Sequence, residues 1–210
     1  MKQNSVNINK VIHKILKIVN NFVNIVSGDK MLYFRSELDK NKYSTYQLDK
    51  AIKNKELFKI GNGLYSDKEF VNPLEIILKK YPNAIFISDS AYYYYDLTDV
   101  IPDYYYLATK RTDTRIKDKN IKQIFIPNDL FDMGKTQIEI ENMKVNIYDE
   151  ERVLVDLIRK KNIIPFDYYK EIINKYRKRI DKLNIYKIQD YISHYKNEAS
   201  LYDTLMREVY

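Results

Sequence analysis

The stretch from Leu32 to Ser66 constrains the fold more than any other part of this 210-residue chain. Residues 33–38 fit a short helix, and residues 39–43 have the polarity of a tight turn. A second helix is expected next, because Ser44 can cap it and Gln47, three residues on, can return a hydrogen bond to the cap. The stretch therefore predicts a helix-turn-helix.

The second helix is expected to be amphipathic and to lead into a hairpin. It should run to about Lys55, with Leu48, Ala51 and Ile52 on its apolar face. The two apolar runs that follow flank Gly61-Asn62-Gly63, and such a turn favours a hairpin because its residues tolerate positive φ. A capped helix followed by a glycine-turned hairpin is the order of a winged helix, which points to duplex DNA.

The charge of the chain is concentrated in the part that holds this pattern. Residues 1–80 contain 15 Lys and Arg against 8 Asp and Glu, a net charge of +7. Residues 81–210 contain 21 of each kind, so their net charge is zero. Because neutralising phosphates supplies most of the sequence-independent affinity for DNA, a confined positive excess is the expected electrostatic pattern of a DNA-binding domain.

Composition and the first residues exclude several classes of protein. The chain has no cysteine, so disulfides, thiol nucleophiles and thiolate metal sites are excluded. The apolar stretch from Val6 to Val26 is interrupted by lysine and asparagine, which argues against a secretory signal or a membrane span and favours a cytoplasmic protein. Its apolar residues instead recur at helical spacing. They predict a long helix from Ser5 that packs under the helix-turn-helix or, alternatively, mediates dimerisation.

A second domain is expected after the polar segment that ends at Pro73. The predicted division is a winged-helix domain over 1–70 and a mixed α/β domain over 73–210 with a helical C-terminal end, so the fold class is α+β. In the second domain we expect helices over 73–80 and 88–97, strands over 84–87, 103–109 and 121–126, a hairpin of strands 136–140 and 143–147, and helices over 149–161, 165–180, 185–196 and 198–209.

The candidate DNA contacts lie on the second helix of the helix-turn-helix and on the hairpin. Thr45 and Tyr46 could reach base edges, while Ser44 and the first amides of the helix face a phosphate. The candidate phosphate contacts, together with the polar tip of the hairpin, are Lys42, Lys50, Lys53, Lys55, Lys59 and Asn62. The alternative is an ordinary solvated face, and Asp49 on the same face favours that alternative.

Two further groups of residues have two interpretations each. The densest basic run comprises Lys175, Arg177, Lys178, Arg179 and Lys182. It could touch DNA, RNA or a partner protein, although such runs are more often a solvated helix face. The tyrosines of 92–95 and 104–106 could stack unpaired bases, but in a chain with 21 Tyr and no Trp they are better explained as core and rim.

The sequence offers little support for catalysis or for a cofactor. There is no glycine-rich phosphate loop, and the two histidines, His13 and His194, have no metal-ligand spacing around them. Glu139, Glu141 and Lys144 lie near the spacing of a metal-dependent nuclease site, but a hairpin with alternating exposed charges explains them as well. We expect a protein that is not an enzyme, with a nuclease as the less favoured alternative.

Three motifs resemble those of the AbiEi antitoxins, in the same order and over nearly the whole chain. The hairpin with Gly63-Leu64-Tyr65 is similar to the end of their winged helix. The segment from Ile87-Ser88-Asp89-Ser90-Ala91 to Asp96-Leu97 is similar to their serine-alanine helix. Residues 151–158, Glu-Arg-Val-Leu-Val-Asp-Leu-Ile, look like their later Glu-Arg and Leu-x-Asp-Leu helix.

The resemblance implies the antitoxin of a type IV toxin–antitoxin system that acts in abortive phage infection. In that family the winged helix binds inverted repeats in the operator and represses its own operon. The second domain counteracts a nucleotidyltransferase-like toxin, in several members without a stable complex. The rival hypothesis is a plain winged-helix regulator whose second domain binds a small molecule or mediates assembly.

Overall fold

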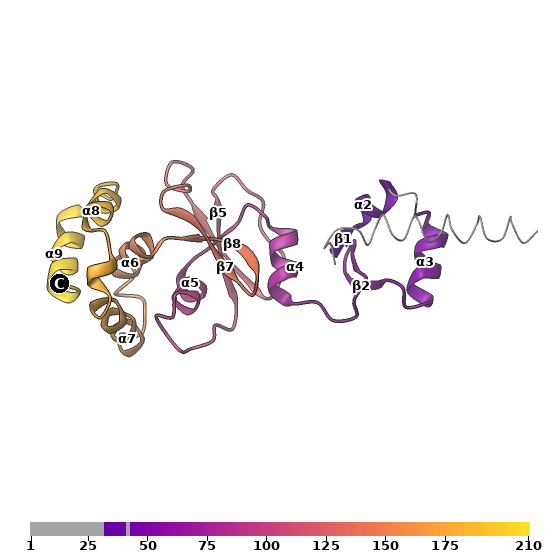
Figure 1. The fold of residues 1–210 in the computed structure, drawn as a ribbon. Coiled ribbons are helices and arrows are strands. Elements are labelled where there is room, and N and C mark those ends of the chain that lie inside the picture. Colours follow the sequence, from indigo (N-terminus) through magenta and orange to yellow (C-terminus); the bar gives the residue numbers. More distant parts are fainter. Residues whose placement is uncertain (1–31, 41–42) are drawn as a thin grey trace, which may run out of the picture. The chain divides into compact units, whose positions relative to one another are not determined.

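The computed structural model describes residues 32–40 and 43–210 (Figure 1). Those residues form an α+β protein with two sheets, which confirms the predicted fold class at this level. The chain divides into two compact units, Met1–Lys80 (unit 1) and Tyr81–Tyr210 (unit 2). The long helix expected from Ser5 and the candidate contact Lys42 lie outside the described residues.

Unit 1 combines a small antiparallel sheet with short helices. The three strands lie in the order β1-β3-β2, so the last strand of unit 1 occupies the middle of its sheet. The hydrophobic core beneath the sheet and helices consists of Tyr33, Leu38, Leu48, Ala51, Leu57 and Tyr65, with Tyr43 and Ile52 packed against it. Its elements are β1 (Leu32–Phe34), α2 (Arg35–Lys40), α3 (Thr45–Lys53), β2 (Phe58–Gly61), β3 (Leu64–Ser66) and α4 (Pro73–Lys80).

The first helix of the predicted helix-turn-helix begins later than its sequence predicts. Tyr33 and Phe34, expected in a helix, belong to β1 and pair with Tyr65 and Leu64 of β3. Leu32 and Tyr33 are buried, and pairing with β3 supplies backbone partners that a helix could not offer at this position. The expectation of a helix over 33–38 is therefore wrong at its start.

Two other helices end earlier than expected, for one physical reason. The end of α3 is Lys53, and Lys55 has a φ of 58°. The helix α5 (Ser88–Tyr94) ends before Asp96, which has a φ of 55°. A residue in the left-handed region cannot continue a right-handed helix, so the chain turns away at both points.

Helix α4 belongs to unit 1, although the sequence analysis assigned it to the second domain. The ammonium group of Lys79 forms an ion pair with Glu37 at 2.8 Å and lies 5.0 Å from the ring centroid of Phe34. These contacts join α4 to the β1–α2 segment. Its bounds agree with the helix predicted from Pro73 to Lys80.

Unit 2 is built on a five-stranded mixed sheet in the order β6-β5-β4-β8-β7. The short central strand β4 pairs antiparallel with β5 and parallel with β8. Glu141 and Asn142, both at positive φ, form the turn of the β7–β8 hairpin, as the sequence predicts. The strands are β4 (Ile85–Phe86), β5 (Tyr105–Lys110), β6 (Ile121–Ile126), β7 (Lys135–Ile140) and β8 (Met143–Tyr148).

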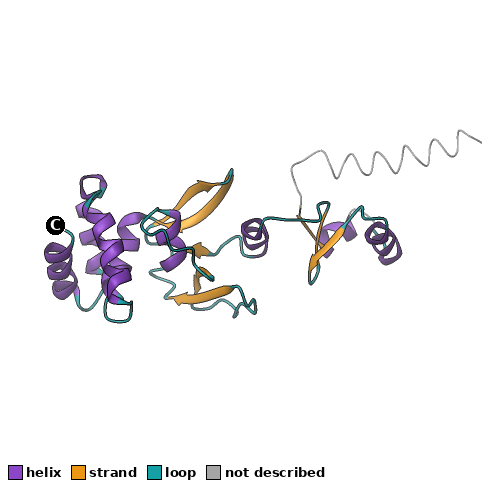
Figure 2. Ribbon diagram, turned by 90° about the horizontal axis from the view of Figure 1, so that it is seen from below, coloured by secondary structure: helices purple, strands orange, loops and turns teal. Residues whose placement is uncertain are grey.

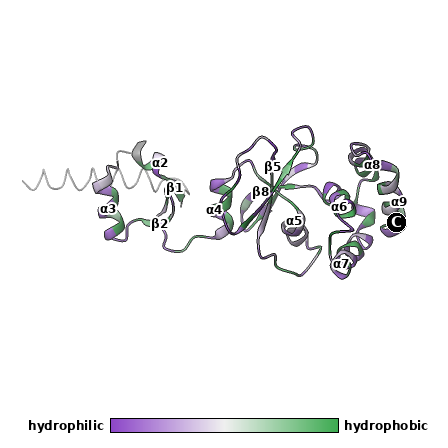
Figure 3. Ribbon diagram, turned by 180° about the vertical axis from the view of Figure 1, so that it is seen from behind, coloured by the Kyte–Doolittle hydropathy of each residue, from purple (hydrophilic) through white to green (hydrophobic). Residues whose placement is uncertain are grey.

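The helices of unit 2 gather mostly beyond one end of the sheet (Figures 1 and 2). The first of them, α6, packs against α5, α8 and α9 and buries seven of its ten residues. Figure 3 shows hydrophobic residues along the central strands and on α6. This helical end consists of α6 (Glu150–Arg159), α7 (Phe166–Arg177), the 3₁₀ turn η1 (Ile180–Lys182), α8 (Ile185–Ser193) and α9 (Glu198–Glu208).

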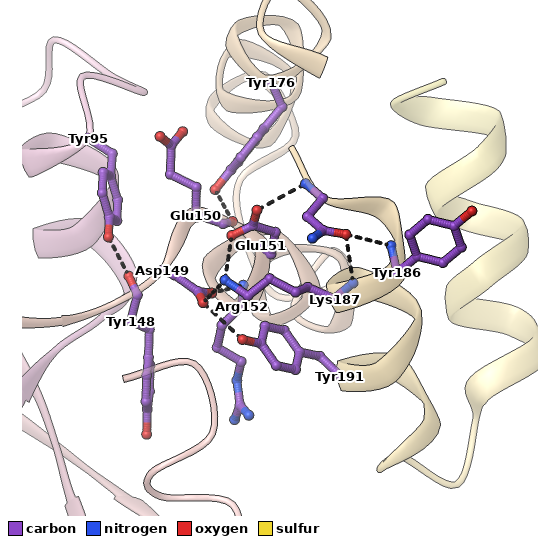
Figure 4. A network of polar contacts seen from close by, with 11 residues as sticks. Tyr95, Tyr148, Asp149, Glu150, Glu151, Arg152, Tyr176, Tyr186, Lys187 and Tyr191 are labelled. Atoms are coloured by element: carbon purple, nitrogen blue, oxygen red, sulfur yellow. Dashed lines mark hydrogen bonds and ion pairs between the residues drawn. The ribbon is translucent and has the colours of Figure 1, made fainter. Parts of the chain in front are cut away.

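A polar network holds the N-terminus of α6 (Figure 4). The carboxylate of Asp149 caps the helix by accepting a hydrogen bond from the backbone N–H of Arg152 at 2.9 Å. It also accepts hydrogen bonds from the Lys187 ammonium at 2.8 Å and from the Tyr191 hydroxyl at 2.9 Å, both on α8. The network thus ties α8 to the start of α6.

The guanidinium of Arg152 is buried inside this region. Only 1% of Arg152 is exposed, and its Nε donates to Asp156 at 3.2 Å. Burial by itself would lower the pKa of Arg152. The Asp156 carboxylate and the neighbouring Tyr195 and Tyr148 outweigh this effect, so the pKa is raised and the group stays charged. The guanidinium also lies 5.0 Å from the Tyr148 ring centroid.

Gly134 lies against this network just before β7. Its φ is +73°, and its carbonyl accepts a hydrogen bond from the backbone N–H of Asp149 at 2.7 Å. A Cβ atom at this position would lie 2.7 Å from Cβ of Arg152. Glycine is required here both by the backbone conformation and by the space.

We expect Gly134→Ala to lower the free energy of unfolding of unit 2 by about 2–4 kcal/mol, because it adds left-handed strain to a clash with a buried side chain. Chemical denaturation followed by circular dichroism measures this change. The matched control is Gly61→Ala, whose added Cβ meets nothing within 4 Å. Equal stability of Gly134→Ala and the wild-type protein would contradict the packing described here.

Candidate nucleic-acid interface

The N-terminus of α3 carries the capping box that the sequence predicts. The Ser44 hydroxyl accepts a hydrogen bond from the backbone N–H of Gln47 at 3.3 Å, and the Gln47 side-chain oxygen accepts one from the backbone N–H of Ser44 at 2.9 Å. Ser44 itself is extended, with φ −64° and ψ 161°. Both bonds join residues three positions apart, so the start of the helix at Thr45 is marked by local contacts.

The rest of α3 has an inner and an outer side. Leu48 and Ala51 are buried in the core of unit 1. The opposite side, which we name the α3 outer face, is exposed, and both hydrophilic and hydrophobic colours appear on this helix in Figure 3. The α3 outer face comprises Thr45, Tyr46, Asp49, Lys50 and Lys53. Tyr46 is 76% exposed, a large aromatic ring held in water without packing against unit 1.

Arg35 lies beside the start of α3, a position that the sequence analysis did not identify. Its guanidinium donates to the Tyr43 carbonyl at 3.4 Å and to the Thr45 hydroxyl at 3.5 Å. Arg35 opens α2, so only the fold of unit 1 places it next to α3. It adds a cation at the helix end whose free amides already favour an anion.

The β2–β3 hairpin presents the other candidate residues. Lys59 on β2 and Asn62 in the turn are both exposed, and the turn depends on Gly63, which has a φ of +67°. The carbonyl of Gly63 accepts a hydrogen bond from the backbone N–H of Arg35 at 2.8 Å. The hairpin is thereby attached to the residue that also borders α3.

The lysines around α3 are unpaired within the described part of the chain. Their side chains are exposed and form no ion pair there; they are Lys50, Lys53, Lys55 and Lys59. Other charged groups of unit 1, such as Glu37 and Lys79, are in ion pairs. The positive charge next to α3 is therefore available to an outside anion.

The structure divides the second basic run of the sequence into two kinds of residue. Arg179 donates to the Tyr95 carbonyl at 2.8 Å and to the Asp96 carbonyl at 3.2 Å, and it pairs with Glu150 at 3.1 Å. Arg177 donates to the Glu208 carbonyl at 2.6 Å. These arginines hold unit 2 together, whereas the three lysines have no such bonds among the described residues and line a pocket: Lys175, Lys178 and Lys182.

The tyrosine run at 92–95 contributes to the core and rim of unit 2. Tyr92 is 1% exposed, and its burial raises the pKa of its hydroxyl well above the usual value. The ring of Tyr94 packs edge-on against Phe86 with centroids 5.5 Å apart, and the hydroxyl of Tyr95 donates to the Tyr148 carbonyl at 2.8 Å. Packing therefore explains most of the run, and Tyr93, 38% exposed, lies at its edge.

The residues of the nuclease alternative lie on one hairpin of unit 2. Glu139 and Lys144 are opposite each other on β7 and β8, and Glu141 is in the turn. Among the residues that the structure describes, no three His, Asp or Glu side chains are grouped as metal ligands would be. The cross-strand pair of opposite charges is the arrangement expected of an exposed hairpin.

Neither a family model nor a curated protein matches the chain. In the part of the chain that the structure covers, no helix is both long enough and apolar enough to cross a lipid bilayer.

We expect Ser44→Ala to destabilise α3 by about 1 kcal/mol, because the first helical amides lose their side-chain acceptor. Hydrogen exchange of the α3 backbone amides measures this loss directly. Ser36→Ala in α2 is the matched control, since Ser36 is exposed and α2 does not start with a serine cap. Unchanged exchange in Ser44→Ala would show that the box does not stabilise the helix.

Proposed function

We propose that unit 1 is a winged helix that binds duplex DNA, with α3 as the recognition helix and the β2–β3 hairpin as the wing. The order β1-α2-α3-β2-β3 and the strand order β1-β3-β2 are those of a winged helix. The observation that carries the proposal is the α3 outer face, which is exposed, begins at a capped helix N-terminus and is surrounded by unpaired lysines. Such a surface suits a phosphate-lined groove.

Different residues of this surface have different roles in the proposal. Thr45 and Tyr46, on the first turn of α3, contact base edges, whereas Lys50, Lys53 and Lys59 contact phosphates. Arg35 joins this set because it borders Thr45. Asp49 lies on the same face and opposes phosphate contact there, because a carboxylate is repelled by every phosphate that it approaches.

We propose further that the protein is a cytoplasmic antitoxin that represses its own operon by binding inverted repeats in the operator. The resemblance to the AbiEi antitoxins supports this function, and it implies a nucleotidyltransferase-like toxin as the functional partner, without the need for a stable complex. The third resembling motif, residues 151–158, forms most of α6, the central helix of unit 2. Unit 2 is accordingly assigned the antitoxin activity.

A plain DNA-binding regulator whose unit 2 binds a small molecule is the second candidate. One observation favours it: unit 2 has a cavity of about 430 Å³ lined by lysines. Cavities of this size accommodate small ligands. The two candidates differ in whether unit 2 protects cells from a toxin.

For DNA binding, we expect log affinity to fall linearly with log salt concentration, and Lys50→Ala/Lys53→Ala to flatten the slope by about 2, one for each lost phosphate contact. Fluorescence anisotropy with an operator duplex at several salt concentrations measures the slope. The matched control is Lys117→Ala/Lys119→Ala, which removes two exposed lysines from unit 2. An unchanged slope in the α3 variant would mean that another face meets DNA.

For the antitoxin, we expect coexpression of this protein to restore growth to cells that express the neighbouring nucleotidyltransferase. The Lys50→Ala/Lys53→Ala variant, supplied from an independent promoter, should protect equally well, because its substitutions lie in unit 1. Growth curves and an operon reporter separate the two activities. Failure of the wild-type protein to protect, with repression intact, would leave the plain regulator as the correct function.

A further inference from the structure

The basic concavity of unit 2, which favours the second candidate function, has a lining that indicates the chemistry of its ligand. Its volume is about 430 Å³, and it lies where the end of α7 and the η1 turn meet the end of α5 and the start of α6. Four cationic side chains line it, and we name this set the basic pocket: Lys175, Lys178, Arg179 and Lys182. All of its lining residues belong to unit 2.

The lysines of the basic pocket come from two consecutive elements. Lys175 is in the last turn of α7, Lys178 is the C-cap residue of α7 with αR geometry, and Lys182 ends η1. The backbone leaves helical geometry between these elements, because Arg179 has a φ of −125° and a ψ of 18°. All three lysines nevertheless line one concavity.

Arg179 holds the α7–η1 side of the pocket against the side formed by the end of α5 and the start of α6. It bonds to the backbone carbonyls of Tyr95 and Asp96, which end α5, and pairs with the carboxylate of Glu150 at the start of α6. The Tyr95 hydroxyl in turn donates to the Tyr148 carbonyl, and the Tyr176 hydroxyl donates to the Glu150 carbonyl (Figure 4). The shape of the pocket is therefore built into the polar contacts of unit 2.

The pocket has a surplus of positive charge that the described part of the protein does not neutralise. Arg179 offsets Glu150, which leaves one carboxylate, that of Asp96, facing three lysines that have no ion-pair partner among the described residues. The lining therefore carries an excess of positive charge that an anion in the concavity would neutralise.

The dipole of α7 does not account for this arrangement. A helix C-terminus favours cations in its last turn, which is a sufficient reason for Lys175 and Arg177. Lys182 lies beyond that turn, at the end of η1, and nevertheless lines the same pocket. Arg177, in contrast, is in the last turn but bonds to the end of α9.

We propose that the basic pocket binds a small ligand through a multiply charged phosphate group, such as the pyrophosphate moiety of a nucleotide. Such a group accepts several charge-assisted hydrogen bonds at once, which matches three ammonium groups around a single depression. A concave pocket suits a compact anion better than a polynucleotide, whose phosphates follow an extended line. The site is independent of the DNA-binding surface proposed for unit 1.

The test is calorimetric titration of the full-length protein with pyrophosphate. We expect saturable binding that Lys175→Gln/Lys178→Gln/Lys182→Gln weakens by about tenfold or more, since each substitution removes a charge from the site. The matched control, Lys117→Gln/Lys119→Gln/Lys196→Gln, makes the same change of charge at exposed lysines outside the pocket and should bind as the wild-type protein does. Circular dichroism of each variant verifies that it is folded, and the single variant Lys178→Gln replaces the triple one if that variant is unstable.

Two results would overturn the proposal. Equal weakening in the pocket variant and the control would show that pyrophosphate responds only to overall charge. Loss of oligonucleotide binding in the pocket variant, with pyrophosphate binding absent even in the wild-type protein, would show that the lysines belong to a polynucleotide surface. The Lys50→Ala/Lys53→Ala variant keeps the two proposals apart, because it should lose DNA affinity and retain pyrophosphate binding.

Discussion

The capped start of α6 is the interaction on which the helical end of unit 2 depends. Asp149 accepts a hydrogen bond from the backbone N–H of Arg152 and also bonds to Lys187 and Tyr191 of α8. Seven of the ten residues of α6 are buried, so most polar groups near its start have little access to water and depend on partners within the protein. The requirement for Gly134 follows from the same crowding, since no Cβ fits between it and Arg152. One carboxylate thus determines where several elements meet.

The start of α3 follows the same physical rule with a different outcome. Its cap, Ser44, is exposed and bonds to Gln47 and Leu48 of the same helix, so it organises the helix without recruiting other elements. Because α3 buries only one side, its outer side keeps polar and aromatic groups in water. A helix that is buried nearly all round serves as a structural centre, whereas a helix buried on one side leaves a surface for a partner. The proposed division of labour between the two units rests on this difference.

Net charge describes the two units incompletely. The whole formal excess of +7 lies in residues 1–80, which supports an interaction of unit 1 with a polyanion. Unit 2 is neutral in sum, yet it concentrates unpaired lysines in the basic pocket, because its arginines and many of its carboxylates are used in internal bonds such as that between Arg179 and Glu150. Local pairing, and not the total, decides which charges remain available to a ligand.

The sequence by itself determined the features that depend on close neighbours. The capping box at Ser44, the bounds of α4 and the β7–β8 hairpin with its Glu141-Asn142 turn all follow from residues a few positions apart. Only the tertiary structure decided that residues 32–34 form a strand, that Arg35 borders α3 and that two of the five basic residues of 175–182 bond to other elements of unit 2. In each of these cases the deciding partner is distant in the sequence, and local propensity carries no information about a partner that folding alone brings into contact.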